Sequence, residues 1–125
     1  MEKRLIFNKD NAKYIVDSDQ DFHCKDGIIS KLDLKKKGLV ESTKKELFFV
    51  TEPTFIDYLS KIKRGPAIMI AKDIGSIIAH TGVGEGWNIV DAGTGCGVLS
   101  SYLARLVGKK GNVTSYEKRE DFLKV

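Results

Sequence analysis

Short apolar runs alternate with polar turns along the first half of the chain, a pattern typical of β structure. The predicted strands are residues 4–7, 14–16, 21–24, 28–29, 39–40 and 47–50. Spacing this regular predicts a small antiparallel β domain over residues 1–52. About fifty residues bury only a small core, so such a domain is marginally stable on its own.

The pattern changes at Pro53. Thr54 can cap a helix with Asp57 three residues later, and apolar side chains then recur at helical spacing at positions 55, 56, 59 and 62. This predicts a linker helix over residues 53–65, ended by Gly65 and Pro66. Its last turn, where cations suit the helix dipole, holds the basic residues Lys61, Lys63 and Arg64.

From residue 66 the pattern predicts an α/β domain. A short helix with Asp73 as its N-cap, a strand over 87–90, a helix over 98–107 and a strand over 113–116 follow in order. The apolar run of the first strand is typical of a parallel strand covered on both faces. One βαβ unit, followed at Glu120 by the start of another helix, is an incomplete doubly wound sheet. We therefore expect residues 66–125 to be part of a longer protein, or to be completed by a partner chain.

Composition narrows the class of protein. Apolar residues make up 42% and charged residues 30% of the 125 residues, as in ordinary folded domains. No apolar run approaches the ~20 residues that span a bilayer, and no signal peptide is visible, so we expect a cytoplasmic protein without a membrane partner. Cys24 and Cys96 are too few for a disulfide scaffold or a four-thiolate zinc site.

The net charge of +4 is unevenly distributed. Between positions 31 and 64, nine Lys or Arg residues stand against five Asp or Glu residues. A basic excess of this kind can attract a polyanion such as RNA. For the run at positions 35–37 alone, a solvated loop is the alternative explanation.

The chemistry-bearing stretch is VDAGTGCG at residues 90–97, which joins the apolar strand to the following helix. Gly93 and Gly95 allow a tight turn and let a ligand approach the backbone. Glu117 lies twenty residues after Gly97, at the end of the next strand, where a carboxylate can accept both hydroxyls of a ribose. The arrangement predicts a nucleoside-cofactor site at the carboxyl ends of parallel strands.

The glycine spacing identifies the kind of cofactor. A dinucleotide fingerprint needs a glycine at position 98, which is Val98. The spacing G-x-G-x-G, with Asp91 two residues before its first glycine, is typical of S-adenosyl-L-methionine-dependent methyltransferases. A tight turn that binds no ligand is the alternative.

The chain resembles, over nearly its whole length, the archaeal and bacterial tRNA (adenine-N1)-methyltransferases that modify a T-loop adenosine. The resemblance is carried by FH and GII at 22–29, FFVTEPT at 48–54, KDIG at 72–75, GVGEG at 82–86 and, most specifically, SYEKREDF at 115–122. The chain departs from the family at Cys96, where Ser is usual, and at Ile70-Ala71, where Tyr-Pro is usual.

The resemblance implies a small N-terminal antiparallel β domain followed by the first βαβ part of a Rossmann-like methyltransferase domain. It also implies S-adenosyl-L-methionine as cofactor, tRNA as substrate and a homotetramer. Adenine N1 would attack the cofactor's methyl group in line, and the protein would orient the reactants and exclude water. The catalytic aspartate and the base pocket are expected downstream of Val125, so no catalytic residue is assigned within the chain.

Motif and resemblance together give the candidate site. Asp91 either holds the amides of the loop or places a carboxylate near the cofactor's amino end. The predicted cofactor-binding residues are Asp91, Gly93, Thr94, Gly95, Cys96, Gly97, Val98, Glu117 and Lys118. The predicted substrate-binding residues are Lys61, Lys63, Arg64 and Lys72, with a surface lysine beside a helix cap as the alternative for Lys72. His23 and His80 lie far along the chain from other ligands, so no metal site is expected.

Two other classes stay open. Another methyltransferase of the same fold, such as a protein isoaspartate or precorrin methyltransferase, shares a similar loop but lacks the N-terminal β domain. The chain could also be an inactive fragment, or an RNA-binding module with an incomplete cofactor fold.

Overall fold

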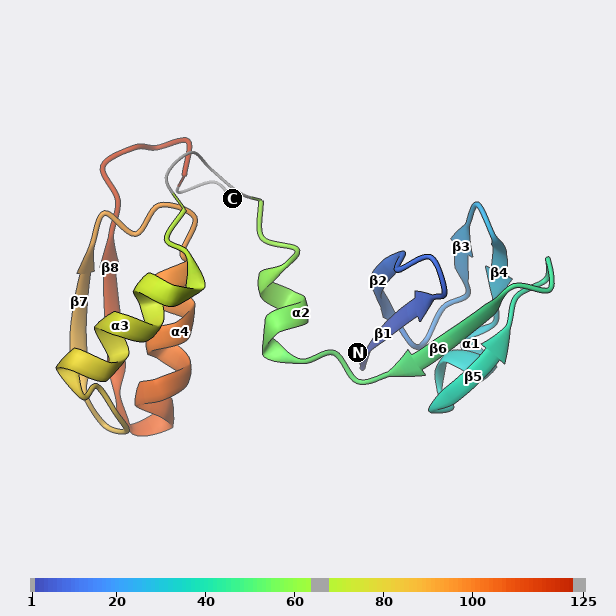
Figure 1. The fold of residues 1–125 in the computed structure, drawn as a ribbon, viewed down its shortest axis with the longest axis horizontal. Helices are drawn as coiled ribbons and strands as arrows, with labels where there is room; N and C mark the ends of the chain where they lie inside the picture. The colour runs from blue at the N-terminus through green and yellow to red at the C-terminus, as the bar shows by residue number, and fades with distance from the viewer. Residues whose placement is uncertain (1, 64–67, 123–125) are drawn as a thin grey trace. The chain divides into compact units, whose positions relative to one another are not determined.

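The computed structural model describes residues 2–63 and 68–122. The chain divides into two compact units, Met1–Lys61 (unit 1) and Ile62–Val125 (unit 2), each with its own hydrophobic core (Figure 1). This division falls inside the 53–65 segment that the sequence predicts as a linker helix. Among the described residues, no helix combines the length and the apolar content needed to cross a membrane.

Unit 1 is built on a four-stranded antiparallel sheet with strand order β2-β1-β6-β5. Its strands are β1 (Lys3–Asn8), β2 (Lys13–Asp17), β5 (Gly38–Glu41) and β6 (Leu47–Thr51). A separate hairpin pairs β3 (Phe22–Cys24) with β4 (Gly27–Ile29). The antiparallel β structure predicted for the first half of the chain is confirmed.

Side chains of this sheet alternate between a closed core and an open face, as the pleat of a strand requires. The core is formed by Ile6, Val16, Ile29, Leu34, Val40, Phe48 and Val50. On the opposite face, Leu39 is 70% and Phe49 40% exposed. The ring of Phe49 lies 5.5 Å from that of Phe7, centroid to centroid.

A short helix that the sequence pattern does not predict, α1 (Lys31–Leu34), completes this core. The hydroxyl of Ser30 accepts the Asp33 amide at 3.2 Å and caps the helix, and Leu34 is fully buried. Four residues make little more than one turn, so they show no helical period in the sequence.

Helix α2 (Phe55–Leu59) begins as predicted and ends earlier than predicted. Thr54 and Asp57 form a reciprocal capping box at its start. The expectation that the helix continues through Ile62, with Lys61 and Lys63 in its last turn, is wrong, because the helix ends at Leu59. None of its residues is buried, so no packed face stabilises a longer helix.

Unit 2 contains two parallel strands joined by a helix, as predicted. β7 pairs with β8 in parallel, with Asp91 opposite Ser115, and α4 packs against both strands (Figure 1). The elements are α3 (Ala71–Thr81), β7 (Asn88–Ala92), α4 (Val98–Val107), the 3₁₀ turn η1 (Gly108–Lys110) and β8 (Asn112–Tyr116). The core of this unit is formed by Val83, Leu103 and Val107, with Ile78, Ile89, Leu99, Leu106 and Val113 partly buried against them.

Two local predictions in unit 2 are wrong. Helix α3 begins at Ala71 with Ile70 as its N-cap, so Asp73 lies in the first turn instead of capping it. Strand β7 is not covered on both faces in the described structure, since Val90 is 69% exposed. The helix predicted to start at Glu120 runs into residues 123–125, which lie outside the described residues. In the last described residues, 120–122, the chain makes a turn in which the Phe122 amide donates to the Arg119 carbonyl at 3.2 Å.

Candidate cofactor site

The site begins where β7 ends and the loop of residues 93–97, the glycine loop, turns into α4. Gly93, Gly95 and Gly97 have φ angles of 85°, 57° and 79°, a left-handed backbone that disfavours residues with a Cβ. The amides of Gly93 and Thr94 both donate to the Tyr116 carbonyl, at 2.7 and 3.1 Å. The glycine loop is therefore fastened to the carboxyl end of β8.

Asp91 is held from the helix side of the loop. The residue is 8% exposed, and its carboxylate accepts a hydrogen bond from the Ser100 hydroxyl on α4. Ser100 is also hydrogen-bonded to the Thr94 hydroxyl and accepts one from the Ser115 hydroxyl at 3.0 Å. Because Ser100 donates its one proton to Asp91, both of its lone pairs serve Thr94 and Ser115. This network joins β7, the glycine loop, α4 and β8.

Glu117 is held from the strand side. One carboxylate oxygen, Oε2, accepts the Gly95 N–H at 2.8 Å, and the other, Oε1, accepts the Arg119 backbone N–H at 2.9 Å and its Nε–H at 3.2 Å. Its side chain is only 4% exposed. The Arg119 N–H, the Arg119 guanidinium and the Gly95 N–H lower the pKa of Glu117 from 4.5 to about 2. The carboxylate is therefore ionised at neutral pH.

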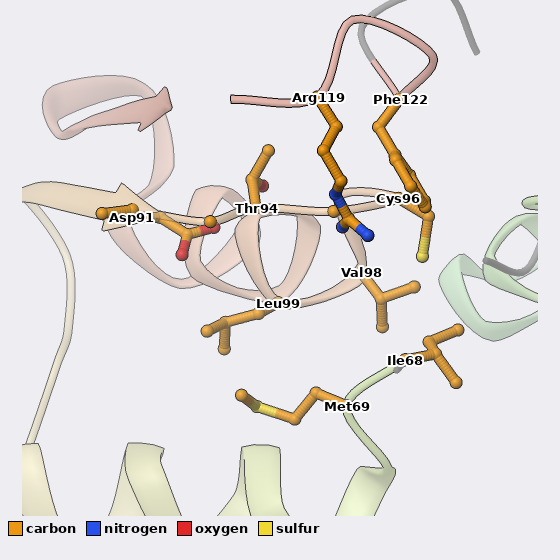
Figure 2. A pocket seen from close by; sticks show the side chains of 12 residues that line it. Ile68, Met69, Asp91, Thr94, Cys96, Val98, Leu99, Arg119 and Phe122 are labelled. Atoms are coloured by element: carbon orange, nitrogen blue, oxygen red, sulfur yellow. The ribbon is translucent and has the colours of Figure 1, made fainter. Parts of the chain in front are cut away.

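A cavity of about 300 Å³ opens beside Asp91 and the glycine loop, within unit 2 (Figure 2). Arg119 and Phe122 enter from the segment after β8, and Ile68 and Met69 from the segment before α3, on opposite sides (Figure 2). The guanidinium carbon of Arg119 lies 3.9 Å from the centroid of the Phe122 ring. The remaining lining residues are Asp91, Ala92, Gly93, Thr94, Gly95, Cys96, Val98 and Leu99.

Most of the residues predicted to bind a cofactor surround this cavity. Gly97 lies beside it as the N-cap of α4, and Glu117 lies against the glycine loop at Gly95. Lys118 is exposed and is not part of the lining. The predicted residues that do line the cavity are Asp91, Gly93, Thr94, Gly95, Cys96 and Val98.

The predicted substrate-binding residues that the structure describes are divided between the two units. Lys61 belongs to unit 1, where its Nζ donates to the Lys13 carbonyl at 2.8 Å. Lys63 and Lys72 belong to unit 2 and are exposed, with Lys72 in the first turn of α3. Arg64 lies outside the described residues.

Sequence reasoning missed several lining residues, of which Arg119 and Phe122 carry the most chemistry. Both follow Glu117 closely: Phe122 lies within the segment interpreted as the start of a helix, and Arg119 lies just before it. A cation two residues after the strand-end acid was a usable signal for Arg119. Ile68, Met69, Ala92 and Leu99 were also missed, and they carry no motif. Among residues 2–63 and 68–122, no group of three or more His, Cys, Asp or Glu side chains is placed to hold a metal.

The chain is similar to known proteins in sequence and in fold. The family model of the tRNA methyltransferase complex GCD14 subunit matches residues 48–124. The tRNA (adenine(57)-N(1)/adenine(58)-N(1))-methyltransferase TrmI of Methanocaldococcus jannaschii is 38% identical over 123 residues, which are 98% of this chain and 41% of that protein. The tRNA (adenine(58)-N(1))-methyltransferase TrmI of Thermus thermophilus is 37% identical over 86 residues, covering 69% of this chain and 34% of that protein. The chain thus spans less than half the length of these relatives.

Two solved structures share the fold. A SAM-dependent O-methyltransferase from Thermotoga maritima superposes with a TM-score of 0.82 at 32% identity, covering 98% of this chain and 48% of that one. The tRNA (m1A58) methyltransferase TrmI from Aquifex aeolicus superposes with a TM-score of 0.67 at 23% identity, covering 98% of this chain and 49% of that one. The fold is therefore that of SAM-dependent methyltransferases, over about half their length.

Proposed function

The chain belongs to the tRNA methyltransferase complex GCD14 subunit family, and from this premise we propose that it forms part of a SAM-dependent tRNA (adenine-N1)-methyltransferase. The observation that carries the proposal is the meeting of the glycine loop, Asp91 and Glu117 at the carboxyl ends of β7 and β8. In parallel sheets this is the edge where nucleoside cofactors bind.

The residues around the cavity fit S-adenosyl-L-methionine. A cavity of about 300 Å³ is within the size range of small-ligand sites, and it offers an apolar wall beside a carboxylate and a guanidinium. A Cβ built on Gly93 or Gly95 would meet no atom within 4 Å, so open space lies above the loop for a ligand to approach the backbone. When bound, the cofactor supplies an electrophilic methyl group on a sulfonium.

Each residue has a proposed part in holding the cofactor. Asp91 presents a carboxylate that can pair with the cofactor's ammonium group, and Ser100 fixes its direction. Glu117 is proposed as the acceptor for the ribose hydroxyls; its oxygens already accept bonds from Gly95 and Arg119, and a carboxylate oxygen can accept more than one. The apolar side chains of Met69, Val98 and other lining residues exclude water from the methyl group.

We propose tRNA as the substrate, with the basic residues of positions 31–64 contacting its phosphates. Support comes from the local excess of cations and from the two TrmI relatives, whose names specify adenosines of tRNA. A homotetramer and a cytoplasmic location are proposed from the family resemblance. Sedimentation analysis of the purified protein tests the tetramer directly.

The methyl acceptor needs its own test, because the Thermotoga maritima structure is described as an O-methyltransferase. Incubation of the protein with SAM and unmodified tRNA, followed by nucleoside mass spectrometry, separates the two chemistries. We expect 1-methyladenosine as the product. A product methylated on oxygen would favour the second activity and contradict the adenine-N1 proposal.

Titration calorimetry with S-adenosylhomocysteine tests the cofactor proposal. We expect binding that weakens about tenfold or more in Glu117→Ala, because a charge-assisted hydrogen bond contributes about 1.5–3 kcal/mol. Lys109→Ala is the matched control, since Lys109 is exposed in η1, at the other end of β8. Equal affinity of the wild type and Glu117→Ala for S-adenosylhomocysteine would show that Glu117 does not bind the cofactor.

A further inference from the structure

Arg119 joins three features of the site. Its backbone N–H and its Nε–H both donate to Glu117 Oε1, at 2.9 and 3.2 Å. Its guanidinium carbon lies 3.9 Å from the centroid of the Phe122 ring, and both side chains line the cavity (Figure 2). One side chain therefore contacts the strand-end acid and forms part of the cavity wall.

The two oxygens of Glu117 connect Arg119 to the glycine loop. A carboxylate is planar, so a donor that fixes Oε1 also fixes the direction of Oε2, which accepts the Gly95 N–H at 2.8 Å. Gly95 sits in the left-handed region at a φ of 57°, in the middle of the glycine loop. The cation on one oxygen of Glu117 is thus connected to the loop through the other oxygen.

The low exposure of the Glu117 side chain favours a cation beside it. The Glu117 side chain is 4% exposed, so little water remains to solvate its charge. An ion removed from water is costly unless it is paired and hydrogen-bonded. Within the described part of the chain, Arg119 is the charged group that contacts this carboxylate. The other titratable side chains on the cavity are Asp91, which is bonded to Ser100, and Cys96.

We propose that Arg119 is a positioning residue, which holds the Glu117 carboxylate against the Gly95 amide and, with Phe122, fixes one wall of the cofactor cavity. The identity of the ligand rests on the proposed function, whereas the connection from Arg119 through Glu117 to Gly95 stands without it. Fork-shaped donors suit such a task, because a guanidinium fixes direction where an ammonium supplies mainly charge.

The Gly95 amide reports this connection without any ligand. Its ¹H–¹⁵N signal follows the ionisation of Glu117, whose pKa is held at about 2. In Arg119→Ala the two backbone donors remain and the guanidinium is lost, so we expect the midpoint of the Gly95 titration to move up toward 4.5. Arg119→Lys should fall between the two, and Lys109→Ala should match the wild type. An unchanged midpoint in Arg119→Ala would overturn the proposal.

The effect on the site is read by titrating the same variants with S-adenosylhomocysteine at neutral pH. We expect Arg119→Ala to weaken binding about tenfold and Arg119→Lys to recover part of the loss. Full affinity in Arg119→Ala, with a shifted Gly95 midpoint, would overturn the role of Arg119 in the cofactor site.

Failure of the proposed function gives a different result. If the wild-type chain binds no S-adenosylhomocysteine while the Gly95 midpoint still shifts in Arg119→Ala, the cofactor proposal fails and the contact to Glu117 stands. If Arg119→Ala loses its folded spectrum, the Gly95 midpoint is measured in Arg119→Lys instead. A raised midpoint supports the connection from Arg119 through Glu117 to Gly95, and an unchanged midpoint refutes it.

Discussion

Glu117 couples the stability of unit 2 to pH. Its folded-state pKa of about 2 lies below the ordinary 4.5, so its contribution to stability is fully present above pH 4.5 and is lost as pH falls toward 2. We expect acid to destabilise Glu117→Gln less steeply than the wild type across this window. Fluorescence of Trp87, the one tryptophan of the chain, follows urea unfolding of unit 2.

Other acids make a control necessary. Asp33 and Asp57 of unit 1 also have lowered pKa values, chiefly through hydrogen bonds from Lys36 and Thr54 respectively. Glu120→Gln removes an exposed acid close to Glu117 and should leave the acid dependence of the Trp87 transition unchanged. Identical acid profiles for Glu117→Gln and the wild type would contradict the bonding described for Glu117.

Ser100 gives a second residue-scale prediction. Ser100→Ala removes the donor to Asp91, a buried residue that is 8% exposed, so we expect unit 2 to lose about 1–3 kcal/mol of unfolding free energy. Ser101→Ala is the matched control, since that hydroxyl donates only to the Gly97 carbonyl one turn earlier in α4. Equal losses in both variants, measured by Trp87 fluorescence, would show that the network around Ser100 contributes nothing specific.

At the scale of elements, the alternation in β6 gives the clearest test of unit 1. Phe48→Ala empties a fully buried position, and we expect a loss of about 3–5 kcal/mol in unit 1. Phe49→Ala removes the same ring from the next position, which faces outward and is 40% exposed, and should cost much less. Circular dichroism of β structure during urea unfolding distinguishes the two; a larger loss for Phe49→Ala would reverse the assigned faces.

Elements with a complete hydrophobic period could be predicted from the sequence. Helix α4 spans ten residues, and its apolar stripe places Leu103 and Val107 in the core. Helices α1 and α2 span four and five residues. The first shows no period, and the extent of the second depends on burial that the sequence pattern does not contain.

The candidate site also has parts that the sequence predicts and parts that it does not. The glycine loop and Asp91 could be predicted, because a strand, a run of glycines and a helix fix their place at the end of β7. The bonding of Glu117 could not, because it depends on a turn that brings Arg119 back onto its carboxylate. That turn lies between Glu117 and Arg119 and carries no periodic pattern, and the ring of Phe122 against Arg119 has no signal in the periodicity either.

At the scale of the whole molecule, the proposed function assigns RNA contacts to the basic region around the linker and the cofactor to unit 2, which are two separately packed parts of the chain. If basic residues near the linker contact phosphates, the logarithm of tRNA affinity should fall linearly with the logarithm of salt concentration. Lys61→Ala and Lys63→Ala should each reduce that slope by about one, while Lys109→Ala should not. Filter binding of tRNA over a range of salt concentrations measures this, and identical slopes in all variants would remove the linker lysines from the interface.

A ¹H–¹⁵N map of the chain titrated with S-adenosylhomocysteine would show directly where the cofactor binds. We predict shifts concentrated on the glycine loop, Val98 and Arg119, with the strands of unit 1 unaffected. A folded chain whose glycine-loop signals do not move, or whose shifts gather on unit 1, would contradict a cofactor site at the carboxyl ends of β7 and β8.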